Sequence, residues 1–318
     1  MQPVSDMIAV IRCAGERTVD TCRMLLEEQV PPSQVFVAGE YPFEATLRRT
    51  YEIGLESNAR WLMSLDADVL LRRGGVACLL AEAERMPRHA FQIEGLVFDK
   101  LTGTLRRAGQ RIYRVELLPH ALDLIPGEGM EIRPEMATLE KMEAEGFPSL
   151  RAGVALGVHD FEQFYRDLYR KAFLHAHKHV IWLSPFVERW RTGATTDVDF
   201  VVALRGLADG LSSPKTSGVD ARAYAARASA ALDQLGLTEK RPLQADEWGS
   251  AKVDELLSTA PATDPDQVSE VETMGVKLAR ARERCRSMGL PRFAAFVAGS
   301  LLSDLGGSLK SMSAKDRR

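Results

Sequence analysis

The chain has few cysteines, and their spacing suits neither a zinc site nor a dithiol motif. Its 318 residues include only four: Cys13, Cys22, Cys78 and Cys285. None forms a CxxC pair, which excludes the common zinc and redox motifs built on that pair. Because these residues lie mostly within apolar segments, we expect buried thiols in a reducing compartment.

Long apolar runs are missing too. No segment reaches the roughly 18 to 20 apolar residues that cross a bilayer. The first residues place an acid, and no basic segment, before a short apolar stretch, which is unlike a signal sequence. We therefore expect a cytoplasmic protein.

Neither sign of charge is in large excess. Lys and Arg number 41 against 44 Asp and Glu, which gives a net charge of −3 and a pI near 6.1. This balance gives no general attraction to nucleic acid, so we expect no nucleic-acid partner. An anionic ligand must then be held by local charges.

What the sequence does contain is an alternation of strand and helix patterns over its first hundred residues. The expected strands cover 7–13, 34–39 and 60–69, and the expected helices cover 18–29, 43–57 and 75–85. This alternation predicts an α/β fold with a mostly parallel sheet flanked by helices. Ligands of such sheets bind beyond the carboxyl ends of the strands.

The remaining two thirds of the chain follow a different pattern. We expect a β-hairpin after residue 89, a loop from 118 with a short helix over 134–145, and helices over 161–206 interrupted at Pro185. A Gly, Ser and Pro-rich linker covers 210–218. The predicted domains are 1–208, divided near residue 100 into two halves, and a helical C-terminal region, 209–318.

Two carboxylates end the third expected strand. Asp66 and Asp68 follow the apolar run that begins at Trp61, and a buried unpaired carboxylate would be costly there. At a turning strand end both acids can reach one divalent cation, for which oxygen ligands are preferred. The DxD pattern therefore indicates a site for Mn²⁺ or Mg²⁺.

Two stretches carry a resemblance to a known family: MIAVIRCAGERTVDTCRMLLEEQ, from residue 7, and WLMSLDADV, from residue 61. With the strand and helix between them, they resemble the nucleotide-sugar-binding half of GT-A glycosyltransferases of the family 2 type. The resemblance covers 7–80 well and continues more loosely to about 206. It implies a Rossmann-like GT-A fold in which Asp66 and Asp68 bind a cation that bridges the diphosphate of the donor.

The resemblance also implies further site residues. His159, at the end of a short apolar run, matches the position of an additional metal ligand. A transferase that inverts the anomeric carbon needs a general base. Three acids are candidates for that base, and the sequence does not choose among them: Glu94, Asp160 and Glu162.

Contacts with the nucleotide-sugar donor follow from the same resemblance. Arg12 and Glu16 match the region that touches the base and ribose, and Arg48 or Arg49 matches an arginine that faces the nucleotide. The second strand lacks the usual acidic turn of the family, so either Glu40 substitutes for it or the role is absent. The processive QxxRW motif is also absent, because FVERW has Phe186 in place of its glutamine.

The expected function is metal-dependent transfer of a sugar from a UDP- or GDP-sugar to a hydroxyl of a glycan, a lipid-linked glycan or a protein. A heptad-like seam over 271–288 favours a helix packed on its own domain, and leaves open a homodimer or peripheral contact with the inner face of the membrane.

Three other classes of protein stay open. A phosphohydrolase of the HD type would use His159 with Asp160, and His175 with His179 one helical turn apart. A nucleotidyltransferase would make the activated sugar, although its glycine-rich phosphate loop is not evident. A non-catalytic GT-A scaffold would serve as a binding or assembly subunit.

Overall fold

The computed structural model describes residues 6–178, 183–214, 216, 218–244 and 247–261. These residues belong to one structural unit. The heptad-like seam expected over 271–288 lies outside the described residues, as does Cys285. Of the remaining thiols, Cys22 is buried as expected and Cys13 is half-buried, whereas Cys78 is exposed, so the expectation of a buried thiol is wrong there.

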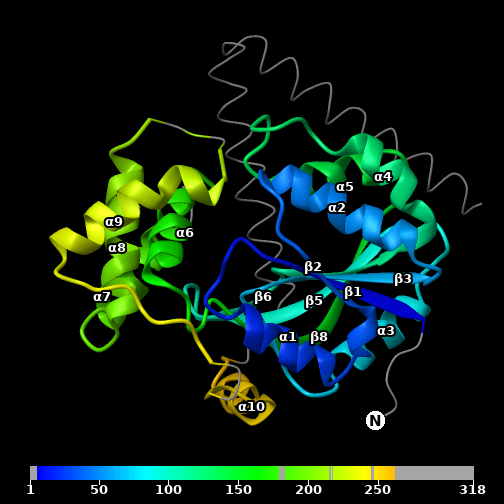
Figure 1. Ribbon diagram of the computed structural model, residues 1–318, viewed down its shortest axis with the longest axis horizontal. Helices are drawn as coiled ribbons and strands as arrows, with labels where there is room; N and C mark the ends of the chain where they lie inside the picture. The colour runs from blue at the N-terminus through cyan, green and yellow to red at the C-terminus, as the bar shows by residue number, and fades with distance from the viewer. Residues whose placement is uncertain (1–5, 179–182, 215, 217, 245–246, 262–318) are drawn as a thin grey trace, which may run out of the picture. The chain divides into compact units, whose positions relative to one another are not determined.

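The core of the fold is a mixed sheet of eight strands (Figure 1). The strands are β1 (Met7–Arg12), β2 (Val35–Ala38), β3 (Trp61–Asp66), β4 (Val69–Leu71), β5 (Gln92–Asp99), β6 (Thr104–Arg106), β7 (Gln110–Arg114) and β8 (Ser149–His159). Their order is β2-β1-β3-β7-β5-β8-β4, and β6 pairs with β5. β1, β2, β3, β5 and β8 run in one direction, which confirms the expected α/β class with a mostly parallel sheet.

The third strand ends earlier than expected. β3 stops at Asp66, a turn covers Ala67 and Asp68, and the chain then enters β4. β4 pairs antiparallel with β8, at the opposite end of the strand order from β2. The expectation of one strand over 60–69 is wrong, because its last apolar residues pair with a different neighbour.

This connection forces the sheet to curl. A flat sheet would separate β3 from β4 by four strand spacings, about 19 Å. The three residue steps from Asp66 to Val69 span at most about 11 Å. β5 and β8 have register shifts around Leu96, and such irregularities bend strands.

Helices cover both faces of the sheet (Figure 1). α1 (Val19–Glu27) and α3 (Gly75–Glu84) lie on one face; α2 (Phe43–Glu56), α4 (Leu118–Leu124) and α5 (Pro134–Ala144) lie on the other. α4 was expected to be loop, and this was wrong because the proline in its first turn is compatible with a helix start. Short 3₁₀ turns occupy Pro32–Gln34, Val115–Leu117 and Ala221–Tyr224.

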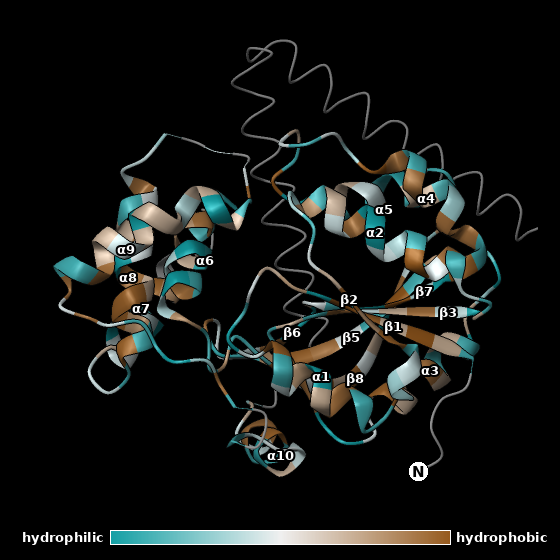
Figure 2. Ribbon diagram, in the orientation of Figure 1, coloured by the Kyte–Doolittle hydropathy of each residue, from teal (hydrophilic) through white to brown (hydrophobic). Residues whose placement is uncertain are grey.

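A second apolar core joins four helices beside the sheet. They are α6 (Tyr165–Lys178), α7 (Leu183–Gly193), α8 (Val198–Leu211) and α9 (Ala225–Gln234). A further helix, α10 (Ser250–Ser258), contacts β8 and β4. Figure 2 shows that the strands are largely apolar and that most helices carry a polar face. Residue 208, where a domain boundary was expected, falls within α8.

No helix among the described residues is both long and apolar enough to cross a membrane.

The crossing of α6 and α8 depends on a glycine. A Cβ atom on Gly206 would lie 2.3 Å from the carbonyl oxygen of Tyr169, closer than real Cβ atoms approach backbone. Gly206 therefore allows α8 to pack directly on α6. This contact fixes the helix that carries several side chains of the cavity described below.

We predict that Gly206→Ala lowers the free energy of unfolding by about 1–3 kcal/mol, because the two helices must separate to admit the methyl group. Chemical denaturation followed by circular dichroism measures this change. Gly153→Ala is the control, because a methyl group on Gly153 would have no atom within 4 Å among the described residues. Equal stability of the two variants would contradict close packing at Gly206.

Candidate functional site

A cavity of about 320 Å³ opens at the carboxyl ends of the strands. Its lining comes from the ends of β1, β2, β3 and β8, from the segment between β6 and β7, from the start of α5, and from α6. Strand ends that are far apart in the sequence therefore meet at one cavity, as the α/β pattern predicts.

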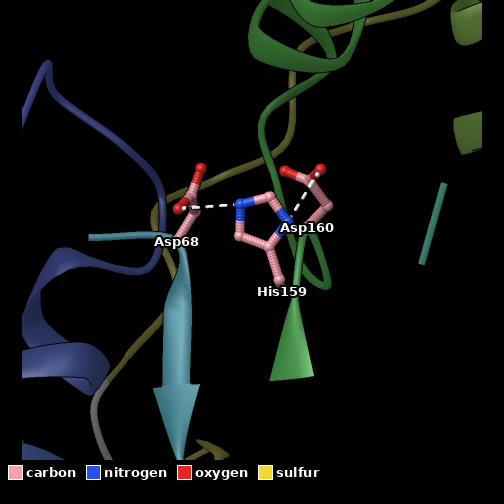
Figure 3. A group of neighbouring side chains, drawn as sticks. All are labelled: Asp68, His159 and Asp160. Atoms are coloured by element: carbon pink, nitrogen blue, oxygen red, sulfur yellow. Dashed lines mark ion pairs between the residues drawn. The ribbon is translucent and has the colours of Figure 1, made fainter. Parts of the chain in front are cut away.

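Three side chains in this cavity form a group that could hold a metal ion: Asp68, His159 and Asp160 (Figure 3). One potential ligand atom from each residue lies within 4.8 Å of the other two. Asp68 ends the turn before β4, and the pairing of Val69 with His159 brings it beside the end of β8. The strand register thus assembles residues that are about ninety positions apart in the chain.

The backbone at Asp160 is unusual. Its φ is 64°, in the left-handed region that a residue other than glycine rarely adopts. The side chain is nevertheless almost completely buried, at 2% exposure. Such a conformation is unfavourable and tends to be found where a side chain must be aimed. Here it directs the carboxylate towards His159.

His159 lies between carboxylates on both sides of its ring. Nδ1 is 2.7 Å from Asp99 Oδ2 and 3.2 Å from Asp160 Oδ2, and Nε2 is 3.4 Å from Asp68 Oδ1. Burial alone would lower the pKa of His159, but the charges of Asp160 and Asp68 outweigh it and raise the pKa to about 10. The imidazole is therefore protonated at neutral pH in this arrangement.

Lys171 neutralises the group. Its ammonium contacts the carboxylates of both Asp68 and Asp160. Burial would raise the pKa of Asp68, but Lys171 and His159 lower it well below its usual range. An ammonium thus occupies the place between two acids where a metal cation would otherwise compensate their charge.

The side chains present fit a divalent cation. Asp68 Oδ1 is buried and makes no hydrogen bond within the part of the chain that the structure describes, although His159 Nε2 lies 3.4 Å away. Two carboxylates and an imidazole are ligands that Mn²⁺ and Mg²⁺ accept to different degrees, with carboxylate preferred by both. A cation that binds here must displace the Lys171 ammonium and, to use His159 as a ligand, a proton from its imidazole ring.

The two acids of the DxD pattern have different partners. Asp66 Oδ1 lies 2.7 Å from both Nε and Nη2 of Arg12. Arg12 also binds Glu135, which in turn binds Arg111 and accepts a hydrogen bond of 2.6 Å from the Tyr113 hydroxyl. Asp66 therefore lines the cavity as part of a buried ion-pair network.

Glu135 is the centre of that network. Burial would raise its pKa, but Arg111 and Arg12 outweigh burial and lower the pKa to about 2. The carboxylate supports two guanidinium groups in the wall of the cavity. Nothing in the local sequence indicates this role, because Glu135 appears there only as an acid in the first turn of an expected helix.

Three further residues expected to contact a donor also line the cavity: Arg12, Glu16 and Glu40. The Glu16 carboxylate accepts a hydrogen bond of 2.6 Å from the backbone N–H of Ala14. Burial raises the pKa of Glu16, and the charge of Asp68 raises it further.

Three other expected site residues do not line this cavity. Arg49 is on α2 and pairs with Glu56 at 2.7 Å. Glu94 is on β5, 3.0 Å from Arg111, and Glu162 pairs with Arg17. His175, one of the histidines considered for an HD site, does line the cavity, whereas His179 lies outside the described residues.

Sequence reasoning missed Lys171, Asp99 and Glu135. Lys171 lies eleven residues after Asp160, on a helix that is polar overall, so nothing in its local pattern distinguishes it. One signal could have identified it. Lys171 lies on the inward face of α6, where a charged side chain is unusual.

No family model matches the chain, and no curated protein matches it in sequence. Several solved structures are similar to it. A mannosyltransferase from Pyrobaculum calidifontis, solved with GDP-Man and Mn²⁺, is 11% identical with a TM-score of 0.35, over 80% of this chain and 85% of its own.

Glucosyl-3-phosphoglycerate synthase from Mycobacterium tuberculosis is 11% identical with a TM-score of 0.32, over 48% of this chain and 72% of its own. A cytidylyltransferase from Leptospira borgpetersenii is 11% identical with a TM-score of 0.33, over 46% of this chain and 76% of its own. GT-A glycosyltransferases are thus among the similar solved structures.

We predict that Lys171→Met strengthens Mn²⁺ binding at least tenfold, because the cation no longer competes with an ammonium for Asp68 and Asp160. Calorimetric titration with MnCl₂ measures the affinity. Lys252→Met is the control, since this lysine is exposed on α10 and pairs only with Glu255 among the contacts described. Unchanged or weaker Mn²⁺ binding by Lys171→Met would show that the ammonium does not compete.

We also predict that Glu135→Gln lowers the free energy of unfolding by about 1–3 kcal/mol at pH 7, because Arg12 and Arg111 each lose one of two carboxylate partners. The depressed pKa means that the carboxylate stabilises the fold above its unfolded pKa of about 4.3. This stabilisation is lost as the pH falls towards 2.

Denaturation curves collected from pH 7 to pH 2 test this prediction. The stability of the wild type should fall more steeply than that of Glu135→Gln below about pH 4.5. Glu84→Gln, at an exposed position on α3, should follow the wild type. Parallel pH profiles for Glu135→Gln and the wild type would contradict the role of Glu135.

Proposed function

We propose that this protein is a glycosyltransferase that uses a nucleotide diphosphate sugar and a divalent cation. The observation that carries the proposal is the Asp68, His159 and Asp160 group at the carboxyl ends of an α/β sheet, beside a cavity of about 320 Å³. Cavities that bind small molecules start at about this volume. The acceptor would be a hydroxyl of a glycan, a lipid-linked glycan or a protein.

The cation would be held by Asp68, His159 and Asp160. When bound, a divalent cation supplies Lewis-acid stabilisation of the negative charge that develops on a leaving diphosphate. Asp66, two residues before Asp68, would instead hold Arg12 at the cavity wall. This assignment gives the two acids of the DxD pattern separate roles.

The donor's nucleoside would lie against the ends of β1 and β2. Glu16 and Glu40 come from the segments after these two strands, and Tyr41 offers an aromatic face in the same part of the lining. Its hydroxyl donates a hydrogen bond of 3.0 Å to the carbonyl oxygen of Ala14, which holds the ring in place. Stacking on such a ring suits a base of any identity.

A general base is needed if the transfer inverts the anomeric carbon. Of the three carboxylates considered for this role, Asp160 lines the cavity, whereas Glu94, which is bound to Arg111, and Glu162, which is bound to Arg17, do not. We assign the role to Asp160. Its two oxygens allow one to face a cation while the other accepts a proton.

We predict that one of UDP, GDP and CDP binds in a Mn²⁺-dependent manner, and that Asp68→Asn weakens this binding at least tenfold, or about 1.4 kcal/mol. The amide keeps the shape of the side chain and removes its charge. Calorimetric titration of each nucleotide, with and without Mn²⁺, measures the effect.

Asp233→Asn is the matched control, because Asp233 is exposed on α9. It should bind the nucleotide as the wild type does. A folded wild-type protein that binds none of the three nucleotides would contradict the transferase and favour a non-catalytic binding or assembly role. Equal binding by Asp68→Asn would remove Asp68 from the cation site.

A further inference from the structure

A second set of charges lines the cavity besides the acids. Arg106 comes from β6, Arg133 from the residue before α5, and Arg170 and Lys178 from α6. We call these four side chains the basic cluster. They belong to three separate elements, so only the folded chain brings them to one wall.

Lys178 is surrounded by like charges from the rest of the basic cluster. Burial lowers the pKa of Lys178, and the positive charges of Arg133, Arg170 and Arg106 lower it further, to about 7. The other buried cations of the cavity behave differently. Acid partners outweigh burial at Arg12 and Lys171 and raise the pKa of both.

The guanidinium group of Arg170 is largely buried and incompletely paired. Its side chain is only 14% exposed, and its acid neighbour Asp167 lies 3.8 Å away, at the long limit of an ion pair. Its Nε is buried and has no hydrogen-bond partner among the residues that the structure describes. A buried guanidinium N–H without an acceptor is costly, which indicates that a ligand supplies one.

The basic cluster begins beside the Asp68, His159 and Asp160 group, because Arg106 and the His159 ring contact the same oxygen of Asp99, and it extends from there along α6. Lys171 contacts Asp68 and Asp160, and Lys178 lies seven residues further along α6, which is about 10 Å of helix. Arg106 pairs with Asp99 at 3.1 Å, on the β6 side of the cavity. The nucleoside position proposed above is at the ends of β1 and β2 instead.

We propose that the basic cluster binds a phosphate group of the second substrate, so that the acceptor is a phosphorylated molecule. This inference rests on the proposed glycosyl transfer. A phosphate monoester carries a charge of about −1.5 to −2 at pH 7 and three acceptor oxygens. It therefore compensates several cations at once, which a single carboxylate does not, and the planar guanidinium groups match its oxygens.

The test uses glycerol 3-phosphate as a small phosphate monoester and glycerol as its neutral counterpart. Calorimetry measures binding to the wild type alone and to the wild type saturated with Mg²⁺ and the nucleoside diphosphate that it binds. We expect glycerol 3-phosphate to bind in both states and glycerol to bind in neither. Lys178→Met and Arg170→Met should each weaken this binding at least tenfold and leave nucleotide binding unchanged.

Lys252→Met, exposed on α10, is the matched control and should bind glycerol 3-phosphate as the wild type does. Circular dichroism checks the fold of each variant. Lys178→Met should unfold at the same or a higher temperature than the wild type, because it removes a charge that its neighbours repel. A lysine that only supports the structure would give a lower unfolding temperature.

Other outcomes overturn the proposal. If glycerol 3-phosphate does not bind, the basic cluster is not a phosphate site for the acceptor. If the bound nucleotide displaces glycerol 3-phosphate and Lys178→Met weakens nucleotide binding, the basic cluster serves the diphosphate of the donor instead. If glycerol 3-phosphate binds while no nucleotide does, the phosphate site stands and the glycosyltransferase proposal fails. The two proposals therefore fail separately.

Discussion

The turn of two residues between β3 and β4 constrains the rest of the sheet. It joins two strands that a flat sheet would hold about 19 Å apart, so the strands between them must curve. The same turn contains Asp68, and the register that follows it places Val69 opposite His159. The curl of the sheet and the meeting of Asp68 with His159 and Asp160 are thus consequences of one short connection.

Charge pairing then determines how the cavity is lined. Asp68 and Asp160 are neutralised by Lys171, Glu135 by Arg12 and Arg111, and both networks are largely buried. In each, removing one partner would leave an uncompensated buried charge, which costs more than the pair contributes. The basic cluster differs, because the strongest charges acting on Lys178 have its own sign. The cavity therefore contains one region where acids and bases are paired and one where like charges meet at Lys178.

The sequence was sufficient for those features that depend on local pattern. Apolar runs alternating with amphipathic helices predicted β1, β2, β3 and the helices between them. The position of Asp68 at a strand end predicted a site there, and the family resemblance added His159. Asp160 was expected only as a candidate general base, and the structure also places it beside Asp68 and His159.

What the sequence did not reveal depends on contacts between distant elements. Asp66 and Asp68 are indistinguishable as a DxD pattern, and only the fold shows that Arg12 binds the first and Lys171 the second. The partner of a charge is decided by tertiary packing, which has no local periodicity. The separation of β4 from β3 was missed for the same reason, since the apolar run continues across the turn.

Lys171 has a consequence for how the protein matures. Many metal sites leave their acids mutually repelling until the ion arrives, so that chelation unfolds the chain. Here the chain carries its own counter-ion to the place where Asp68 and Asp160 meet. The fold around Asp68 and Asp160 therefore needs no metal ion to compensate these two carboxylates, and a cation that replaced the ammonium would change what fills the site and not whether the chain folds.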